Sequence, residues 1–463
     1  MCIRDSLSDA ERYDQWKRVR QGAAGVVVGT RSAVFAPCEN LGLIILDEEQ
    51  EHSYKSENSP RYAAREVAMW RGHKEGALVL LGSATPSVES MYHAKQGDYR
   101  LYRLQNRYNG RALPETQIVD MREELKLGND GTLSIPLRQA IHDTLAADKQ
   151  AILLLNRRGN SRALVCVDCR KAPECPRCSE RLTYHSANNR LLCHYCGYSV
   201  PVPDRCPSCG GPLKTLGTGT QRVQQELSAL FPDVEVARMD ADTVSASNPH
   251  EVILDRFRRG EQKILLGTQM VAKGLDMPNV TLVGVLDADL SLYSGSFRAA
   301  ETTFNMLTQV VGRAGRGSFA GRAILQTMVP NHELIRLAAQ QDYDRFYDLE
   351  IRLRQVQHVP PFADQVLIGF QGLQEPQVLM GAAKFRDSLL QLQRSGNFGP
   401  MELLGPAPSP VPKINYQFRY RLTLRCRMEK NIRGALRYLL CAFGKDSKMR
   451  GVSAFIDVNG FMD

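Results

Sequence analysis

Eight of the twelve cysteines in the sequence form four Cys-x-x-Cys pairs within one short stretch. Each pair can offer two thiolates to one edge of a tetrahedron, so two pairs can close one structural zinc site. The gaps between successive pairs are five, fourteen and nine residues. Because five residues are short for a zinc ribbon and fourteen are close to ribbon spacing, we expect the two inner pairs to hold one zinc ion and the two outer pairs another. The outer ligands are Cys166, Cys169, Cys206 and Cys209, and the inner ligands are Cys175, Cys178, Cys193 and Cys196.

A site closed by four sulfurs has no open position for a substrate, so we expect this zinc to be structural. Disulfides are the alternative use of these cysteines, but nothing in the sequence is secretory. The remaining four cysteines show no ligand spacing and are expected to be ordinary small apolar residues.

Two carboxylates follow an apolar run that is typical of a buried strand. Leu41 to Leu46 leads directly into Asp47-Glu48-Glu49-Gln50. At the carboxyl end of a strand, the first carboxylate can hold Mg²⁺ and the second can orient or deprotonate an attacking water. We therefore predict that Asp47 and Glu48 are catalytic; a solvated loop is the alternative for this tetrapeptide alone.

Two arginines stand between glycines at the end of a predicted helix. Ala300, Phe304, Leu307 and Val311 form one apolar helical face, which leads into Gly312-Arg313-Ala314-Gly315-Arg316. Arginines three residues apart suit a transferring phosphoryl group, whose oxygens gain charge in the transition state. We predict catalytic roles for Arg313 and Arg316, with a basic surface turn as the alternative.

We call Asp47 to Gln50 the acidic box. Aromatic and basic residues beside it are candidates for contacts with single-stranded DNA, because rings stack on bases and cations bind phosphates. Small hydroxyls and a cation also end the strand predicted at Val26 to Gly29, where α/β proteins place ligand contacts. Packing of the tyrosines in a loop is the alternative. The candidates are Thr30, Arg31, Ser32, Tyr54, Lys55, Arg61 and Tyr62.

Near the C-terminus, one predicted strand has an apolar face and a basic face. From Tyr416 to Arg427, apolar residues alternate with polar residues, four of which are arginines. Arg419 and Arg421 are therefore candidate phosphate contacts, although a merely solvated face fits the same pattern.

The bulk composition is that of a globular protein. The chain has 463 residues, 43% hydrophobic and 24% charged, with a formal net charge of +9. This length predicts about three domains, and the charge favours a polyanionic partner. Because the longest apolar runs are too short to cross a bilayer, we expect a cytoplasmic protein with no membrane partner.

The order of predicted elements is that of α/β domains. A third strand, Leu78 to Leu81, precedes Gly82-Ser83-Ala84-Thr85 and a helix capped by Ser87. Helices and strands alternate again on both sides of the cysteines, and a helical connector at Glu333 to Gln357 precedes the last domain. In that domain we expect a strand, a helix, one middle strand, a helix and a final strand at Ser453 to Val458.

Three segments resemble superfamily 2 helicase motifs. Ser83-Ala84-Thr85 resembles motif III, Gly267-Thr268 to Gly274-x-Asp276 resembles motif V, and Gln309-x-x-Gly312-Arg313-x-Gly315-Arg316 resembles motif VI. With the acidic box and the cysteine insert, residues 7–463 resemble the PriA family of primosomal replication-restart helicases. By this resemblance, Gln309, Gly274 and Asp276 bind nucleotide.

The resemblance also implies a function. It indicates a 3′ to 5′ DNA helicase that uses ATP with Mg²⁺, recognises stalled forks, acts with primosome proteins and contacts single-strand-binding protein. It implies an α/β fold with two RecA-like domains of a superfamily 2 helicase, a two-zinc insert with eight cysteines, and a small α+β C-terminal domain that helps to bind DNA. Many family members have histidine after the second glutamate of the acidic box. This chain has Gln50 there, a neutral donor and acceptor that should still couple the nucleotide site to DNA.

The expected domain boundaries follow from these motifs. Residues 1–6 are expected to be an artefact, and residues 361–463 to form a ferredoxin-like domain that binds DNA or a partner. Between them we expect part of the first RecA-like domain (7–105), a linker and the start of the second (106–163), the zinc insert (164–214), the rest of the second (215–330) and a helical connector (331–360).

No Gly-x-x-x-x-Gly-Lys-Ser/Thr phosphate-binding loop occurs in the 463 residues. In the family that the chain resembles, this loop precedes the acidic box, so we expect the chain to be N-terminally truncated. Because the loop supplies the phosphate-binding amides, a lysine and a Mg²⁺ ligand, we expect negligible ATP hydrolysis from this chain alone.

Two other interpretations remain open. The chain can be a non-catalytic zinc-containing adaptor that binds DNA, although Asp47, Glu48, Arg313 and Arg316 make sense only around a nucleotide. It can also be a superfamily 2 translocase of the RecG or RecQ kind, although the eight-cysteine insert and the ferredoxin-like tail argue against this.

Overall fold

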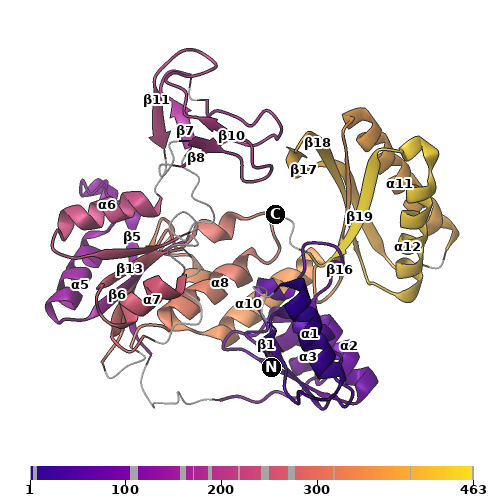
Figure 1. Ribbon diagram of the computed structural model, residues 1–463, viewed down its shortest axis with the longest axis horizontal. Coiled ribbons are helices and arrows are strands. Elements are labelled where there is room, and N and C mark those ends of the chain that lie inside the picture. The colour runs from indigo at the N-terminus through magenta and orange to yellow at the C-terminus, as the bar shows by residue number, and fades with distance from the viewer. Residues whose placement is uncertain are drawn as a thin grey trace. The chain divides into compact units, whose positions relative to one another are not determined.

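The chain forms two units in a computed structural model, and each is described by itself (Figure 1). The first comprises Met1–Tyr102 with Asp457–Gly460, and the second comprises Arg103–Ile456 with the last three residues. The structure describes residues 2–3, 8–104, 113–156, 163–169, 171–185, 190–216, 219–240, 250–268, 277–315, 319–396 and 398–460. Among these residues, no helix is both long enough and apolar enough to cross a bilayer.

The first unit is built around two parallel strands, β3 (Leu43–Asp47) and β4 (Leu78–Gly82), which lie in register. Residues 1–6, which were expected to be an artefact, include β1 (Cys2–Ile3), which pairs with β2 (Val28–Gly29). The helices are α1 (Asp9–Arg20), α2 (Ala64–Glu75) and α3 (Val88–Gln96), with short 3₁₀ helices at Arg31–Phe35 and His52–Tyr54.

One face of the β3–β4 pair is open to solvent. Leu43, Ile45, Leu78 and Leu80 are between 48% and 68% exposed. Alternation along a strand puts such residues on one side of the sheet. The acidic box therefore follows a strand that is covered on one face only.

The second unit contains a six-stranded parallel sheet in the order β12-β13-β6-β14-β15-β5. This sheet confirms the predicted α/β class, and β5, which was not predicted as a strand, forms its edge. The strands are β5 (Glu115–Asp120), β6 (Gln150–Leu155), β12 (Val236–Met239), β13 (Ile264–Gly267), β14 (Val280–Leu286) and β15 (Arg322–Thr327). The helices are α4 (Met121–Lys126), α5 (Ile135–Ala146), α6 (Thr220–Leu230), α7 (His250–Arg258) and α8 (Ala299–Val311).

Both faces of this sheet are covered. All six residues of β6 are buried, which explains its continuous apolar sequence. Leu137 of α5 and Leu227 of α6 pack with Leu153 of β6 in one core, and α8 packs on β14.

The cysteine-rich insert forms a five-stranded sheet in the order β10-β9-β8-β7-β11, and its pairs are antiparallel. Its strands are three or four residues long. They are β7 (Ala163–Cys166), β8 (Thr183–His185), β9 (Arg190–Leu192), β10 (Ser199–Pro201) and β11 (Leu213–Leu216).

The helical connector predicted at Glu333 to Gln357 consists of two helices, α9 (Glu333–Gln340) and α10 (Tyr343–Gln357), because Gln341 adopts a left-handed conformation that ends α9. The C-terminal domain follows, with the sheet order β17-β18-β16-β19. Its elements are β16 (Asp364–Gly372), α11 (Glu375–Ser395), β17 (Met401–Ile414), β18 (Gln417–Cys426), α12 (Lys430–Lys445) and β19 (Val452–Val458). This βαββαβ order is ferredoxin-like.

The prediction of one middle strand in this domain is wrong, because β17 and β18 form a hairpin. β17 contains Pro406, Pro408, Pro410 and Pro412, which cannot donate to a strand ladder. The strand is nevertheless possible because it lies at the edge of the sheet, where one side of its backbone needs no partner.

Candidate functional site

The acidic box lies where β3 ends, and its second residue has an unusual backbone. Glu48 has a φ of 49°, a left-handed conformation that costs a residue other than glycine on the order of 1–3 kcal/mol and that clusters at active sites. Its backbone N–H donates to the Oδ1 of Asp47 at 3.1 Å. The Asp47 side chain is exposed at the strand end, where it is accessible to a cation.

A chain of hydrogen bonds connects the acidic box to the loop after β4. The Nε2 of Gln50 donates to Glu48 Oε2 at 2.7 Å, and the Oε1 of Gln50 accepts from Ser83 Oγ at 2.5 Å. Ser83 Oγ in turn accepts from the amide of Thr85 at 2.9 Å. Gln50 therefore uses both its donor and its acceptor, and a proton or charge change at Glu48 would be felt at Ser83 and Thr85.

Glu49 anchors the box, a role that the sequence did not suggest. Its buried carboxylate accepts from the amide of Ser87 at 2.6 Å and from Ser90 Oγ at 3.1 Å, and it pairs with Arg65 at 3.0 Å. These partners lie on α2 and at the start of α3. The acidic box, α2 and the start of α3 are thereby held together.

Arg65→Met is expected to destabilise the first unit by about 2–3 kcal/mol, because removing one partner leaves a buried carboxylate without its counter-charge. Lys17→Met, at an exposed position of the same unit, should change the stability by less than about 0.5 kcal/mol. The stability of both variants is measured by urea titration, with hydrogen exchange of the α3 amides as the probe of unfolding. Equal effects for the two variants would show that the Arg65–Glu49 pair contributes nothing.

The segment after the acidic box is fixed to β3. The hydroxyl of Tyr54 donates to the backbone oxygen of Asp47 at 2.8 Å. Burial, followed by the negative charge of Asp47, raises the pKa of Tyr54, so this hydroxyl keeps its proton. Arg31 donates to the backbone oxygens of Ser53 and Lys55 at 3.3 and 3.0 Å.

The other DNA candidates of this unit also have partners in the chain. Lys55 pairs with Asp457 at 2.8 Å, and Arg61 lies 3.9 Å from the same carboxylate. The ring of Tyr62 packs edge-on against Phe35, with centroids 4.8 Å apart. Thr30 and Ser32 lie at the start of the 3₁₀ helix Arg31–Phe35. A role of these residues in DNA binding stays a prediction.

In the second unit, α8 carries Gln309 and ends at the loop that holds Arg313. Gly315 has a φ of 72°, and a Cβ there would lie 2.6 Å from the backbone nitrogen of Gly321, so only glycine fits. Gln309 and Arg313 are half-buried. Three predicted site residues, Arg316, Gly274 and Asp276, lie outside the described residues.

A buried ion-pair network fixes α8. Arg354 of α10 is 1% exposed and pairs with Glu301 of α8 and with Glu350, each at 2.8 Å. A guanidinium with two carboxylate partners is well compensated when buried. The network therefore fixes α8, and the position of Gln309 with it.

The structure brings the eight predicted zinc ligands together in two clusters. The outer cluster contains Cys166, Cys169, Cys206 and Cys209, and the inner cluster contains Cys175, Cys178, Cys193 and Cys196. Within each, the four Sγ atoms lie within 4.8 Å of one another. Four converging thiols with this spacing fit a tetrahedral Zn²⁺ site, so the clusters fit two structural zinc ions.

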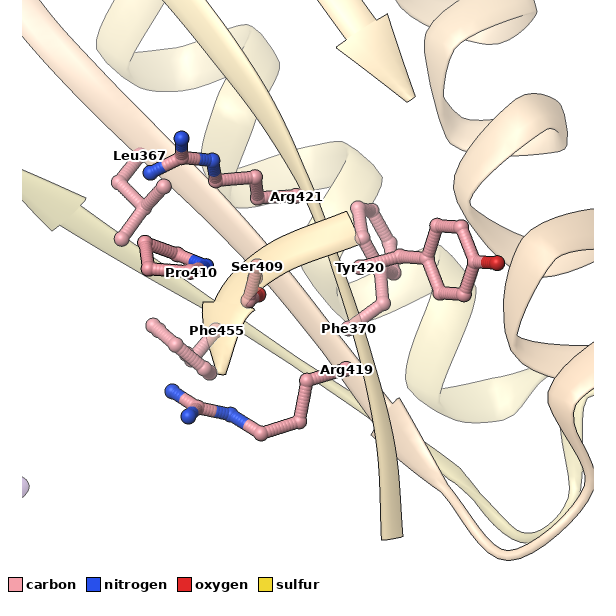
Figure 2. A pocket seen from close by; sticks show the side chains of 9 residues that line it. Leu367, Phe370, Ser409, Pro410, Arg419, Tyr420, Arg421 and Phe455 are labelled. Carbon is pink, nitrogen blue, oxygen red and sulfur yellow. The ribbon is translucent and has the colours of Figure 1, made fainter. Parts of the chain in front are cut away.

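The open face of the C-terminal sheet carries the two predicted arginines. Figure 2 shows Arg419, Arg421 and Phe455 on one side of the sheet, and Tyr420 with Phe370 on the other. The second side is the one that the helices cover, since Phe370 contacts Phe385 of α11 and Phe443 of α12.

Gly369 lets the ring of Phe455 lie against the sheet, because a Cβ at this position would lie 2.3 Å from Phe455 Cζ. Leu367 and Pro410 line the same shallow depression. An aromatic ring between two guanidinium groups combines a stacking surface with phosphate-binding charge.

Three family models match the chain. The helicase conserved C-terminal domain matches residues 217–318, the PriA DNA helicase Cys-rich region domain matches residues 175–201, and the primosomal protein N C-terminal domain matches residues 355–460.

Curated relatives match nearly the whole chain, and each is a replication restart protein PriA. The one from Bacillus subtilis is 43% identical over 99% of this chain and 57% of its own length. Those from Synechocystis and Haemophilus influenzae are 41% and 36% identical, over 90% and 97% of this chain and 51% and 61% of their own. A solved structure of RecG bound to a three-way DNA junction matches at 15% identity and a TM-score of 0.40, over 76% of this chain and 36% of that one, which is too weak to support a conclusion.

The parallel sheet and the helicase C-terminal model define a superfamily 2 helicase fold with a zinc insert. More narrowly, the chain belongs to the PriA family of replication restart proteins. It spans about half to three fifths of the length of the curated relatives named above.

Proposed function

We propose that this chain serves an ATP-dependent 3′ to 5′ DNA helicase that recognises stalled replication forks in the cytoplasm and restarts replication by primosome assembly. Its partners would be forked and single-stranded DNA, primosome proteins and single-strand-binding protein. Membership of the PriA family supports this proposal.

The hydrogen-bond chain from Glu48 through Gln50 to Ser83 is the observation that carries the proposal. Bound Mg²⁺ would neutralise charge on the nucleotide phosphates, and Asp47 is the residue that would hold it. Glu48 would orient or deprotonate the attacking water, and Arg313 would contact the transferring phosphoryl group. Through Gln50, the loop Ser83 to Thr85 would sense the state of Glu48, which is the coupling that a motor requires.

Directional unwinding tests this function. The full-length gene product is mixed with duplexes that carry a single-stranded tail at either the 3′ or the 5′ end, with and without ATP. ATP-dependent unwinding of the 3′-tailed duplex is the expected result. Tight binding to both duplexes with no ATP-dependent unwinding would instead favour a non-catalytic adaptor.

The open face of the C-terminal sheet is proposed to take part in DNA binding. Phe455→Ala should weaken binding of single-stranded DNA by about 1–2 kcal/mol, that is about 5- to 30-fold, because stacking on one base is lost. Arg421→Ala should make the slope of log binding constant against log salt concentration shallower by about one, because one phosphate contact is lost. Tyr438→Ala, at an exposed ring on α12, serves as the control and should leave binding unchanged. Fluorescence anisotropy at several salt concentrations measures all three, and unchanged affinity for Phe455→Ala would exclude this face.

A further inference from the structure

The tip of the β17–β18 hairpin lies against the inner cysteine cluster, and both belong to the second unit. Ile414, the last residue of β17, packs against the apolar core of the insert, which includes Leu182 and Leu191. Asn415 and Tyr416 form the turn with φ angles of 46° and 64°. Two successive left-handed residues are typical of a tight hairpin turn, so the tip has a defined shape.

Three hydrogen bonds fix this tip to the Cys175–Cys178 pair. The amide of Asn415 donates to Cys178 Sγ at 3.1 Å, and the amide of Tyr416 donates to the oxygen of Arg177 at 2.7 Å. In return, the amide of Ser179 donates to the oxygen of Lys413 at 2.9 Å. The hairpin thus contacts the backbone on both sides of Cys178 and the sulfur itself.

The donor to Cys178 differs from the donors to other ligand sulfurs. The sulfurs of Cys175, Cys196, Cys206 and Cys209 accept from backbone amides two or three residues further along the chain. Cys178 instead accepts from a residue 237 positions away in the sequence. A zinc ion with four thiolates carries a net charge of −2, and amide donors to the sulfurs disperse it. The C-terminal domain therefore supplies part of the environment of this metal site.

We propose that the C-terminal domain and the inner zinc site stabilise each other through the hairpin tip. Asn415 acts as a positioning residue for Cys178, and zinc in turn fixes the sulfur that the tip binds. Because such coupling is reciprocal, detachment of the tip weakens zinc binding by the same factor by which zinc loss weakens attachment of the tip. Outer partners of metal ligands typically change metal affinity by about 10- to 100-fold.

The first test removes the apolar contact of the tip in the full chain. Ile414→Glu places a charge against the core of the insert and is expected to release the inner zinc about tenfold faster to the chelating dye 4-(2-pyridylazo)resorcinol. Gln417→Glu adds the same charge at the exposed residue that pairs with Ile414, and should release zinc at the native rate. Cys169→Ser lacks an outer ligand, so the zinc that this variant releases comes from the inner site. Its release rate therefore identifies the kinetic phase of the inner zinc. Equal rates for the two charged variants would overturn the proposal.

A second test runs in the other direction and does not depend on the folding of Ile414→Glu. Cys193→Ser removes one inner ligand, and amide hydrogen exchange is compared with that of the native chain. Exchange at Asn415 and Tyr416 should speed up at least about tenfold, while Leu422 in the middle of β18 should keep its protection. Unchanged protection at the tip after loss of the inner zinc would show that the hairpin and the metal site are independent.

Discussion

Glu48→Gln is expected to lower DNA-stimulated ATP hydrolysis by the full-length gene product at least about 100-fold, with DNA affinity and zinc content unchanged. The substitution removes a negative charge and a proton acceptor from the side chain that Gln50 contacts. A glutamine side chain can still accept the hydrogen bond from Gln50 Nε2, so the local geometry should survive. The loss of rate then reports on chemistry and not on folding.

The control for this prediction is Glu39→Gln, which removes the same charge from an exposed position of the first unit. It should hydrolyse ATP at the native rate in a coupled assay with saturating single-stranded DNA. If Glu48→Gln also retained the native rate, the acidic box would have no hydrolytic role. The adaptor interpretation, with DNA binding independent of nucleotide, would then account better for the chain.

The sequence predicted best what depends on local spacing. Two cysteines three residues apart lie close together in any tight turn, so the ligand pairs were visible without knowledge of the fold. The glycines around Arg313 were likewise informative, and Gly315 proves to need a left-handed backbone. The strand before Asp47 was visible because its residues are apolar.

The sequence predicted poorly what depends on contacts between distant segments. Glu49 looked like a third acidic residue in a loop, yet its partners Arg65 and Ser90 lie 16 and 41 positions away. No local pattern marks such a pair. β17 was missed for a different reason, since its prolines argue against a strand unless the strand is known to lie at an edge. Likewise, the contact between Asn415 and Cys178 exists only once the C-terminal domain has folded.

Cys169→Ser is expected to reduce the zinc content from two ions per chain to one and to unfold the outer part of the insert. A serine hydroxyl stays protonated at neutral pH and is a poor substitute for thiolate, so the remaining three sulfurs cannot close the site. Structural zinc in small domains contributes on the order of 10 kcal/mol of folding free energy. Cys166, the first ligand of the outer site, is the last residue of β7. In the sheet it pairs with Leu213 of β11, so loss of the outer zinc should loosen the pairing of these two strands.

The two zinc sites should respond separately, because they share no ligand. Elemental analysis of Cys169→Ser should find one zinc ion, and hydrogen exchange should show lost protection at residues 213–216 with retained protection at Asn415 beside the inner site. Cys441→Ser, at an exposed cysteine outside both clusters, should keep two zinc ions. Loss of both ions from Cys169→Ser would mean that the insert folds as one cooperative unit around a pair of interdependent sites. Because the inner cluster has its own apolar core of Leu164, Leu182 and Leu191, we expect it to keep its metal when the outer site is lost.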